Sequence, residues 1–355
     1  MRCARPILAL VLLLAALSGC GPDRPPLPPE ESIVVPGTGS VTVYVEAPRS
    51  IAGPILKSFT EQSGVEVHPY YRENLGEDFF PRLVAGATAG QVDVFWAVTP
   101  LAAMDLARQN LAVPFRPLGA RPVPGQYRDM EFRWIGFAVN PRVIIYNSTL
   151  VGRGEAPQSI DDLVRAPWSG KGALSRIRQG TSAFQAAALF ALRGAERAQS
   201  FYEDVARRRN LIAEDDAGVV DLVSSGKAPW GLCDLDVAIA ANRQGAPLHI
   251  TYPRLTPEAF VIPEVASLVR KAPHLHQAKG LIAYLLTTET AYQLGQNDRA
   301  LITVLSGVPK PDWLPTLSAF NVTRLDNQEV FEAYRRNAPF LAAWGAGAAG
   351  GAPER

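Results

Sequence analysis

The stretch "VDVFWAVTPLAAMDLARQN", residues 92–110, indicates the kind of fold that this chain adopts. Its first seven residues are almost entirely apolar, which is typical of a parallel strand buried on both faces. The segment from Pro100 onward predicts a helix that ends near Asn110. A strand followed by a helix is the repeating unit of α/β proteins, in which crossover connections join the strands of a mostly parallel sheet.

The same alternation extends toward the N-terminus. "SVTVYVEAP" (40–48) has the alternation and β-branched residues of a strand, and "IAGPILKSFTEQSG" (51–64) predicts a helix that Gly64 stops. "VEVHPYY" predicts a second strand and "FFPRLVAGATAG" a second helix. Together with residues 92–110, these segments predict one α/β region.

A second α/β region follows a long extended pair of segments, "FRWIGFAVNPRVIIYN" (132–147). It contains the predicted strands "KGALS" and "APWGLCD", with helices between them. Near "LHITYPR" (248–254) we expect the chain to cross back to the first region. There "HQAKGLIAYLLTTETAYQLGQ" predicts one long amphipathic helix.

The length of the chain predicts two lobes. About 315 residues follow residue 40, and a single hydrophobic core rarely keeps growing beyond about 300 residues. The expected parts are lobe 1 (41–138), lobe 2 (139–250), a return to lobe 1 with C-terminal helices (251–320), a helical segment (321–345) and a disordered tail (346–355).

The N-terminus is interpreted as a targeting segment. Arginines precede the apolar run "ILALVLLLAAL" (7–17), which has the length of a signal-peptide core and is too short to span a membrane. "LSGC" (17–20) resembles the bacterial lipobox, so we expect residues 1–19 to be cleaved and Cys20 to be lipidated. The alternative is an ordinary secretory signal that contains a cysteine. The Pro-rich residues 20–40 predict a disordered tether between the lipid anchor and the folded body.

Composition narrows the class of partner. The chain has 35 Lys and Arg against 34 Asp and Glu, a formal net charge of +1, which gives no support to binding of nucleic acid. We expect a small-molecule or ion ligand instead. Cys233 is the one thiol left after Cys3 and Cys20, and we expect it to be buried. His274 and His276 are a weak metal signal compared with a solvated helix start, so we predict no metal site and no cofactor.

The order of these segments resembles the substrate-binding proteins of ABC importers, within the branch of the ferric-iron-binding proteins. The resemblance covers nearly all of residues 40–310. It rests on the shared order of "VTVYVEAP…FTEQSGVEV", "VDVFWAVTPLAAMDLARQNLAVPF", "RWIGFAVNPRVIIYN", "APWSGKGALSRIRQGTSAFQAAALFALRGAERAQSFYEDV" and "DLVSSGKAPWGLCDLDVAIAANRQGAPLHITYP". It implies two α/β lobes with mixed, mostly parallel sheets, two crossing hinge strands, and a ligand held between the lobes by hinge closure.

The chain departs from the iron-binding members of that branch at their ligands. The branch holds ferric ion with two adjacent tyrosines, helped by a histidine on the first loop and an acid on the first lobe, as suits a hard cation. Here Asp236 and Val237 stand in place of the tyrosines, and Pro48 and Arg49 in place of the histidine. Val98 stands where the acid is expected. The resemblance therefore implies the fold and a role in transport, without the metal.

Candidate ligand-binding residues lie where loops follow predicted strands, because open α/β sheets place ligands at the carboxyl ends of their strands. The resemblance also implies that the residue matching Arg142 helps to hold an anion. The candidates are Glu46, Arg49, Trp96, Arg142, Thr181, Ser182, Asp234 and Asp236.

Each candidate also has a structural explanation. Trp96 is a natural packing residue, and Arg49 is equally well explained as a solvated surface residue. Thr181 and Ser182 begin a helix, where their hydroxyls and the free N–H groups could bind an anion or simply cap the helix. Asp234 and Asp236, two residues apart on an expected extended segment, either face a ligand or stay hydrated at the surface.

Three functions remain open. The first is a solute-binding protein for a small polar ligand that contacts hydroxyls, the two aspartates and one or more arginines. The second keeps iron, bound by Asp234 and Asp236 together with an exogenous anion on Arg142 and the helix start at Thr181. The third is an exported enzyme that uses the aspartates as an acid/base pair, although the sequence offers no nucleophile with a base partner.

We favour the first function and predict that the protein is not an enzyme. The expected partners are the ligand, the membrane permease of an ABC importer, and the membrane in which the lipid on Cys20 is anchored. The protein is expected to be a monomer on the periplasmic or extracellular face of that membrane.

Overall fold

The computed structural model describes residues 29–31, 37–253, 260–320 and 322–346. The predicted signal peptide, Cys20, most of the predicted tether and the tail beyond Ala346 lie outside the described residues. Within the described ranges, no helix combines the length and the apolar character that crossing a membrane requires.

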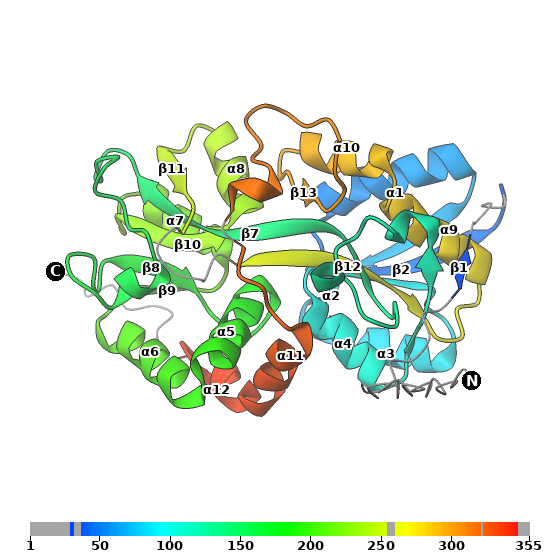
Figure 1. The fold of residues 1–355 in the computed structure, drawn as a ribbon, viewed down its shortest axis with the longest axis horizontal. Coiled ribbons are helices and arrows are strands. Elements are labelled where there is room, and N and C mark those ends of the chain that lie inside the picture. Colours follow the sequence, from blue (N-terminus) through cyan, green and yellow to red (C-terminus); the bar gives the residue numbers. More distant parts are fainter. Residues whose placement is uncertain (1–28, 32–36, 254–259, 321, 347–355) are drawn as a thin grey trace, which may run out of the picture.

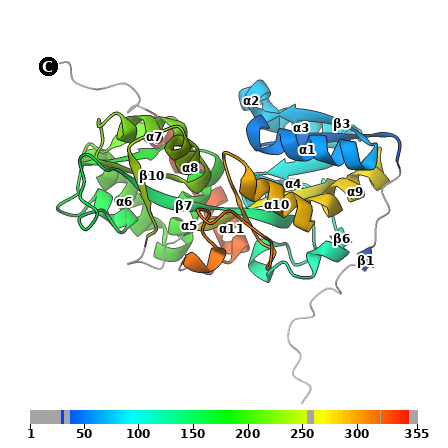
Figure 2. The ribbon, with the colours of Figure 1, turned by 90° about the horizontal axis from the view of Figure 1, so that it is seen from above.

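Two α/β lobes lie side by side and are joined by long strands (Figures 1 and 2). One mixed sheet of eleven strands runs through both lobes, with β3-β2-β4-β12-β7-β10-β8-β9 as its main path. These strands are β2 (Ser40–Val45), β3 (Glu66–Tyr71), β4 (Val94–Ala97), β7 (Ile135–Asn147), β8 (Gly172–Ser175), β9 (Leu211–Ala213), β10 (Trp230–Asp234) and β12 (Val261–Val269). The predicted fold class is confirmed.

The first lobe is built on β2, which pairs in parallel with β3 and β4. The strand and helix predicted within residues 92–110 are confirmed as β4 and α4, and the helix predicted at 51–64 ends at Gly64 in the left-handed conformation. The helices of this lobe are α1 (Arg49–Ser63), α2 (Arg72–Leu75), α3 (Phe79–Ala89), α4 (Pro100–Arg108), α9 (Leu275–Leu285) and α10 (Thr288–Gln296).

In the second lobe β8 pairs in parallel with both β10 and β9. Four helices connect or follow these strands: α5 (Gly180–Arg193), α6 (Ala195–Arg207), α7 (Asp216–Ser224) and α8 (Leu235–Arg243). Cys233 lies on β10 and is fully buried, as predicted.

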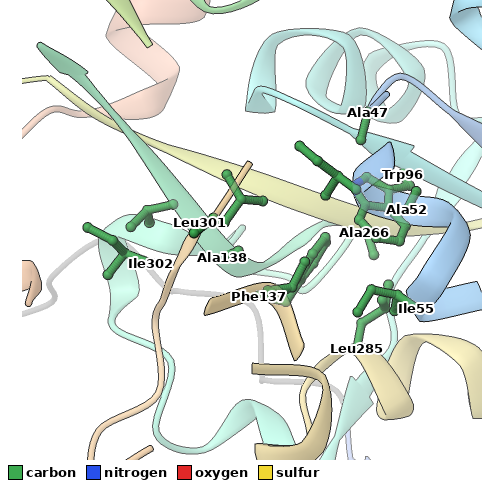
Figure 3. Packing of buried hydrophobic residues seen from close by; sticks show 14 of the residues in the cluster. Ala47, Ala52, Ile55, Trp96, Phe137, Ala138, Ala266, Leu285, Leu301 and Ile302 are labelled. Atoms are coloured by element: carbon green, nitrogen blue, oxygen red, sulfur yellow. The ribbon is translucent and has the colours of Figure 1, made fainter. Parts of the chain in front are cut away.

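Strand β7 joins the lobes. Its first half pairs with the antiparallel β12 and with β13 (Ile302–Thr303), and its second half with β10 and β11 (Leu248–Thr251). All thirteen residues of β7 are buried, so residues 132–147 contain one long strand where a pair of segments was expected. Figure 3 shows Trp96, Phe137 and Ala266 packed together where β4, β7 and β12 meet.

Three local features differ from the sequence predictions. The expected long helix at 276–296 is two helices, because the Thr287 side chain accepts the Thr290 N–H and starts α10 anew. Asp236 lies in the first turn of α8, because β10 ends at Asp234 and the segment does not stay extended. The predicted tether is ordered at β1 (Glu30–Glu31), which pairs with β6 (Arg116–Pro117).

The C-terminal segment packs on the second lobe. Helix α11 (Asn327–Arg336) packs against α5 and contacts α4 of the first lobe. Helix α12 (Ala338–Ala343) is followed by Trp344, whose indole N–H donates to the Tyr202 carbonyl at 2.9 Å.

Candidate ligand-binding cleft

A cleft of about 520 Å³ lies between the two lobes. Its walls are the segments that follow β2, β3 and β4 in the first lobe, and β8, β9 and β10 in the second. Loops at the carboxyl ends of strands are the usual ligand site of open α/β sheets. The cleft is lined by Glu46, Pro48, Arg72, Glu73, Gly76, Glu77 and Val98, by Ser175, Arg176, Arg178–Ser182, Glu214–Ala217, Asp234 and Val237, and by Arg299.

Arg142 is the buried centre of the second-lobe wall. Its Nη1 donates to Asp234 Oδ1 at 2.8 Å and also to Asp216, and its Nε donates to Gln185 Oε1 at 3.0 Å. Burial opposes the charge of Arg142, but Asp216 and Asp234 outweigh that effect and raise its pKa. Two carboxyl groups therefore share one guanidinium, and the group carries an excess of negative charge when both are ionised.

Asp234 carries part of that excess at the cleft surface. Its Oδ2 accepts the Thr181 hydroxyl at 2.7 Å, and its backbone N–H donates to Asp216 at 2.8 Å. Burial raises the pKa of Asp234 to about 7, although Arg142 acts in the opposite direction. A nearby cation would lower this pKa again and favour the carboxylate.

The hydroxyl groups at the start of α5 already have hydrogen-bond partners, so this helix start is not free to bind an anion through them. Thr181 donates to Asp234, and the Ser182 hydroxyl lies 2.6 Å from the Ser175 hydroxyl and 3.5 Å from Asp216 Oδ1. Carboxylate oxygens thus already lie beside the hydroxyls at this helix start. Neither hydroxyl caps α5, because no side chain at its N-cap accepts from the helix.

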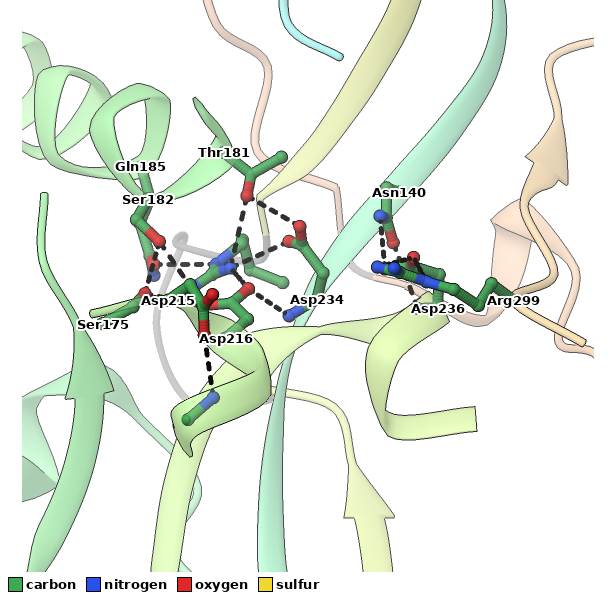
Figure 4. Close-up of polar contacts among 12 residues, drawn as sticks. Asn140, Ser175, Thr181, Ser182, Gln185, Asp215, Asp216, Asp234, Asp236 and Arg299 are labelled. Carbon is green, nitrogen blue, oxygen red and sulfur yellow. Dashed lines mark hydrogen bonds and ion pairs between the residues drawn. The ribbon is translucent and has the colours of Figure 1, made fainter. Parts of the chain in front are cut away.

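Asp236 belongs to a separate cluster beside the crossing strands (Figure 4). It is buried, accepts the Asn140 amide at 2.8 Å, and forms an ion pair with Arg299 at 2.6 Å. Arg299 lines the cleft, whereas Asp236 lies behind it. The sequence suggested similar roles for Asp234 and Asp236. Because the chain turns into α8 between them, Asp234 pairs with Arg142 at the cleft whereas Asp236 pairs with Arg299 behind it.

The first-lobe wall carries Glu46, whose side chain is buried. Arg72 donates to Glu46 Oε1 at 2.7 Å, and Val98 N–H donates to Oε2 at 3.2 Å. Burial raises the pKa of Glu46 despite both contacts. Arg72 also donates across the cleft to Gln179, so this pair connects the two lobes directly.

Arg49 and Trp96 lie outside the cleft lining. The Arg49 side chain is 64% exposed on α1, where it stacks on Tyr71 and pairs with Glu73 at 3.6 Å. Trp96 is fully buried, packs edge-on against Phe137, and donates its indole N–H to Glu264 at 2.8 Å. Both positions agree with the structural explanations given for these residues above.

Sequence reasoning missed several residues of the cleft, chiefly Arg72, Arg178, Glu214 and Asp216. Arg72 directly follows β3, and Asp216 begins the helix that follows β9. Applying the strand-end rule to every strand would have found these two. The pairing of Arg142 with Asp216 needed the tertiary structure, because 74 residues separate them.

The described residues that line the cleft differ in type from those of a tyrosine-based iron site. Among the described residues that line it there is no tyrosine, and the described part of the chain holds no group of three His, Cys, Asp or Glu placed to bind a metal ion. His274 precedes α9, and its ring lies 3.0 Å from Asp93.

Comparison with known proteins identifies the family. The sequence model of a family of bacterial extracellular solute-binding proteins matches residues 92–317. This match covers more than half of the chain, so the chain belongs to that family. Its members are binding proteins, which agrees with the prediction that the chain is not an enzyme.

Individual relatives are more distant. A Fe(3+)-binding periplasmic protein of Serratia marcescens is 23% identical over 253 residues, covering 69% of this chain and 73% of that protein. The structure of iron-bound HitA from Pseudomonas aeruginosa superposes with a TM-score of 0.75 at 20% identity, over 85% of this chain and 98% of HitA. AfuA from Actinobacillus pleuropneumoniae, solved with fructose-6-phosphate, gives a TM-score of 0.74 at 14% identity, over 86% and 98% of the two chains.

Proposed function

We propose that this chain is an extracytoplasmic binding lipoprotein that captures a small polar solute between its lobes and delivers it to the permease of an ABC importer. The observation that carries the proposal is the cleft, in which charged groups of both lobes and hydroxyl groups of the second lobe line one volume between the lobes. A volume of this size suits a small organic ligand. Membership of a solute-binding family supports the same function.

The contact residues in this proposal are Glu46, Thr181, Ser182 and Asp234, all of which line the cleft. Arg142 acts through Asp216 and Asp234 by holding them in place. Asp234→Ala is expected to weaken binding by about 1 to 3 kcal/mol, the usual cost of leaving a buried partner unpaired. Calorimetric titration with the solute that co-purifies with the protein measures this loss.

Native mass spectrometry of protein purified from its own host tests the function. A bound small molecule that denaturation releases supports the proposal. An empty protein that binds nothing from a host extract contradicts it. Catalytic turnover of the released molecule would favour the enzyme alternative.

The lipid anchor is tested by Cys20→Ala. The variant is expected to move from the membrane to the soluble fraction with unchanged unfolding, because the substitution removes the residue that would carry the lipid and leaves in place the β1 pairing and the ion pairs of Glu30 and Glu31. Retention at the membrane would contradict the anchor.

Iron is the second candidate, because the relatives from S. marcescens and P. aeruginosa are described as iron-binding and iron-bound. Its proposed ligands in this chain, Asp234 and Asp236, both pair with arginines and lie in different surroundings. This donor set favours the polar solute. Ferric citrate added to the apoprotein is expected to give no intense visible charge-transfer band, and a strong purple or red band would contradict that expectation.

A further inference from the structure

The charges that line the cleft are unevenly distributed. Among the described lining residues, seven carry carboxylates and four carry guanidinium groups. Most of these carboxylates have a guanidinium partner of their own, either in the lining or directly behind it. The balanced pairs are Glu46 with Arg72, Glu73 with Arg49, and Glu77 and Glu214 with Arg178 and Arg176. Arg299 is likewise balanced by Asp236.

The unbalanced charge lies on the second-lobe wall. Asp216 and Asp234 share the single guanidinium of Arg142. Their neighbour Asp215 accepts the Gly218 N–H as the N-cap of α7 and has no ion-pair partner within the described residues. This wall therefore presents three carboxyl groups for one guanidinium at adjoining positions of the cleft, and a cation bound there would favour their ionised form.

The same wall disfavours an anionic ligand. The start of α5 would otherwise attract an anion, but the Thr181 hydroxyl is donated to Asp234 and Ser182 lies beside Asp216. An anion at this helix start would lie beside the carboxyl groups of both Asp216 and Asp234. Repulsion of that kind costs much more in a cleft than in open solvent.

We infer that the solute is an organic cation, whose ammonium or guanidinium group binds at Asp215, Asp216 and Asp234 beside Thr181. The inference rests on the proposed function and names the class of solute. A protonated amine supplies the N–H donors that carboxylate oxygens accept in strong, charge-assisted hydrogen bonds. It also restores the charge balance of the wall without the converging ligand geometry that a metal ion requires.

Pools of natural small molecules test the class of solute before the solute itself is identified. Extracts of host cells and their spent medium are separated at pH 8 on ion exchangers into cationic, anionic and uncharged pools. Each pool is added to the mature protein with and without excess EDTA, and the thermal midpoint is recorded. The cationic pool is expected to raise the midpoint by a few degrees in both conditions, because a ligand stabilises the state that binds it.

Three results would overturn the inference. They are stabilisation by the anionic pool, stabilisation by the uncharged pool, and a cationic-pool effect that EDTA abolishes, which would identify a metal ion. Stabilisation by no pool would contradict the proposed function itself, so the two failures are distinguishable.

Variants that remove one carboxylate at a time test where the cationic group of the solute binds. Asp215→Asn retains the capping oxygen of α7, and Asp234→Asn retains an acceptor for Thr181. With the solute isolated from the active pool, each is expected to raise the Kd roughly ten-fold or more, because a lost charge-assisted hydrogen bond is typically worth over 1.4 kcal/mol. Asp221→Asn is the matched control, since Asp221 is exposed on the same helix away from the cleft lining. Equal Kd values for all three variants would contradict the placement.

Discussion

Two groups of buried acidic residues, one around Asp234 and one around Asp236, differ in how many arginines balance their carboxyl groups. On the second-lobe wall, Asp216 and Asp234 share one arginine at the surface of the cleft. Beside the crossing strands, Asp236 has Arg299 and the Asn140 amide to itself, behind the cleft. A carboxylate with a full set of partners holds structure together, whereas carboxylates in excess are available to a ligand. The comparison teaches that the number of arginines per carboxyl group distinguishes the two regions, with one arginine for two carboxyl groups on the wall and one for Asp236 alone.

The largest expected effect comes from removing the shared cation. Arg142→Met leaves two carboxylates buried without a counter-charge, so the free energy of unfolding should fall by about 3 to 5 kcal/mol. Arg49→Met is the control, because the side chain of Arg142 is 2% exposed and that of Arg49 is 64% exposed. Denaturant unfolding of both variants at neutral pH measures the difference. Equal losses would mean that the second-lobe wall does not depend on its arginine.

Asp236→Ala sharpens the contrast with Asp234. We expect it to lower the free energy of unfolding by roughly 2 kcal/mol, since it leaves Arg299 and Asn140 without their partner. Affinity for the solute should change much less than in Asp234→Ala. Asp298→Ala, at an exposed pair with Arg243, provides the control for loss of a surface carboxylate. A variant of Asp236 that loses affinity but keeps stability would place this residue in the binding site.

A third test concerns the buried carboxyl of Glu264, near the same crossing strands. Burial raises its pKa to about 8, although the Trp96 indole donates to it. The folded state therefore retains a proton that the unfolded state loses above pH 4.5, and this residue makes stability fall as pH rises from about 4.5 to 8. Glu264→Gln keeps an acceptor and removes the ionisation.

The Gln variant should match the wild type near pH 4.5 and exceed its stability by more than about 1.4 kcal/mol at pH 9, since each unit by which the pKa of Glu264 is raised corresponds to about 1.4 kcal/mol. Denaturant unfolding between about pH 4.5 and 9 measures this difference. Parallel profiles for the two proteins would show that Glu264 ionises freely in the fold.

The smallest expected effect comes from Thr181→Val. It removes one hydroxyl donor from Asp234 and should lower the free energy of unfolding by about 1 kcal/mol at neutral pH. Losing that donor should also raise the pKa of Asp234 further, because the hydrogen bond favours its charged form. Thr149→Val, on the surface of the second lobe, is the comparison variant. NMR titration of the Asp234 carboxyl would show the pKa change, and an unchanged value would mean that Thr181 does not affect its charge.

The sequence by itself determined the class of fold. Buried apolar runs such as 92–98 followed by helical spacing require parallel strands with crossover helices, because period and burial are local properties of the chain. It also predicted Glu46, Thr181, Ser182 and Asp234 at strand ends, which can be read from the same pattern, and all four line the cleft.

The tertiary structure alone decided how the charged groups pair. Arg142 reaches Asp216 across 74 residues, and Asp236 reaches Arg299 across 63. Such partners are set by the register of β7 with β10 and by the packing of the lobes, which no local pattern encodes. The turn from β10 into α8 then separates Asp234 from Asp236. Burial and pairing follow from that three-dimensional placement, and they decide which carboxylate is free to meet a ligand.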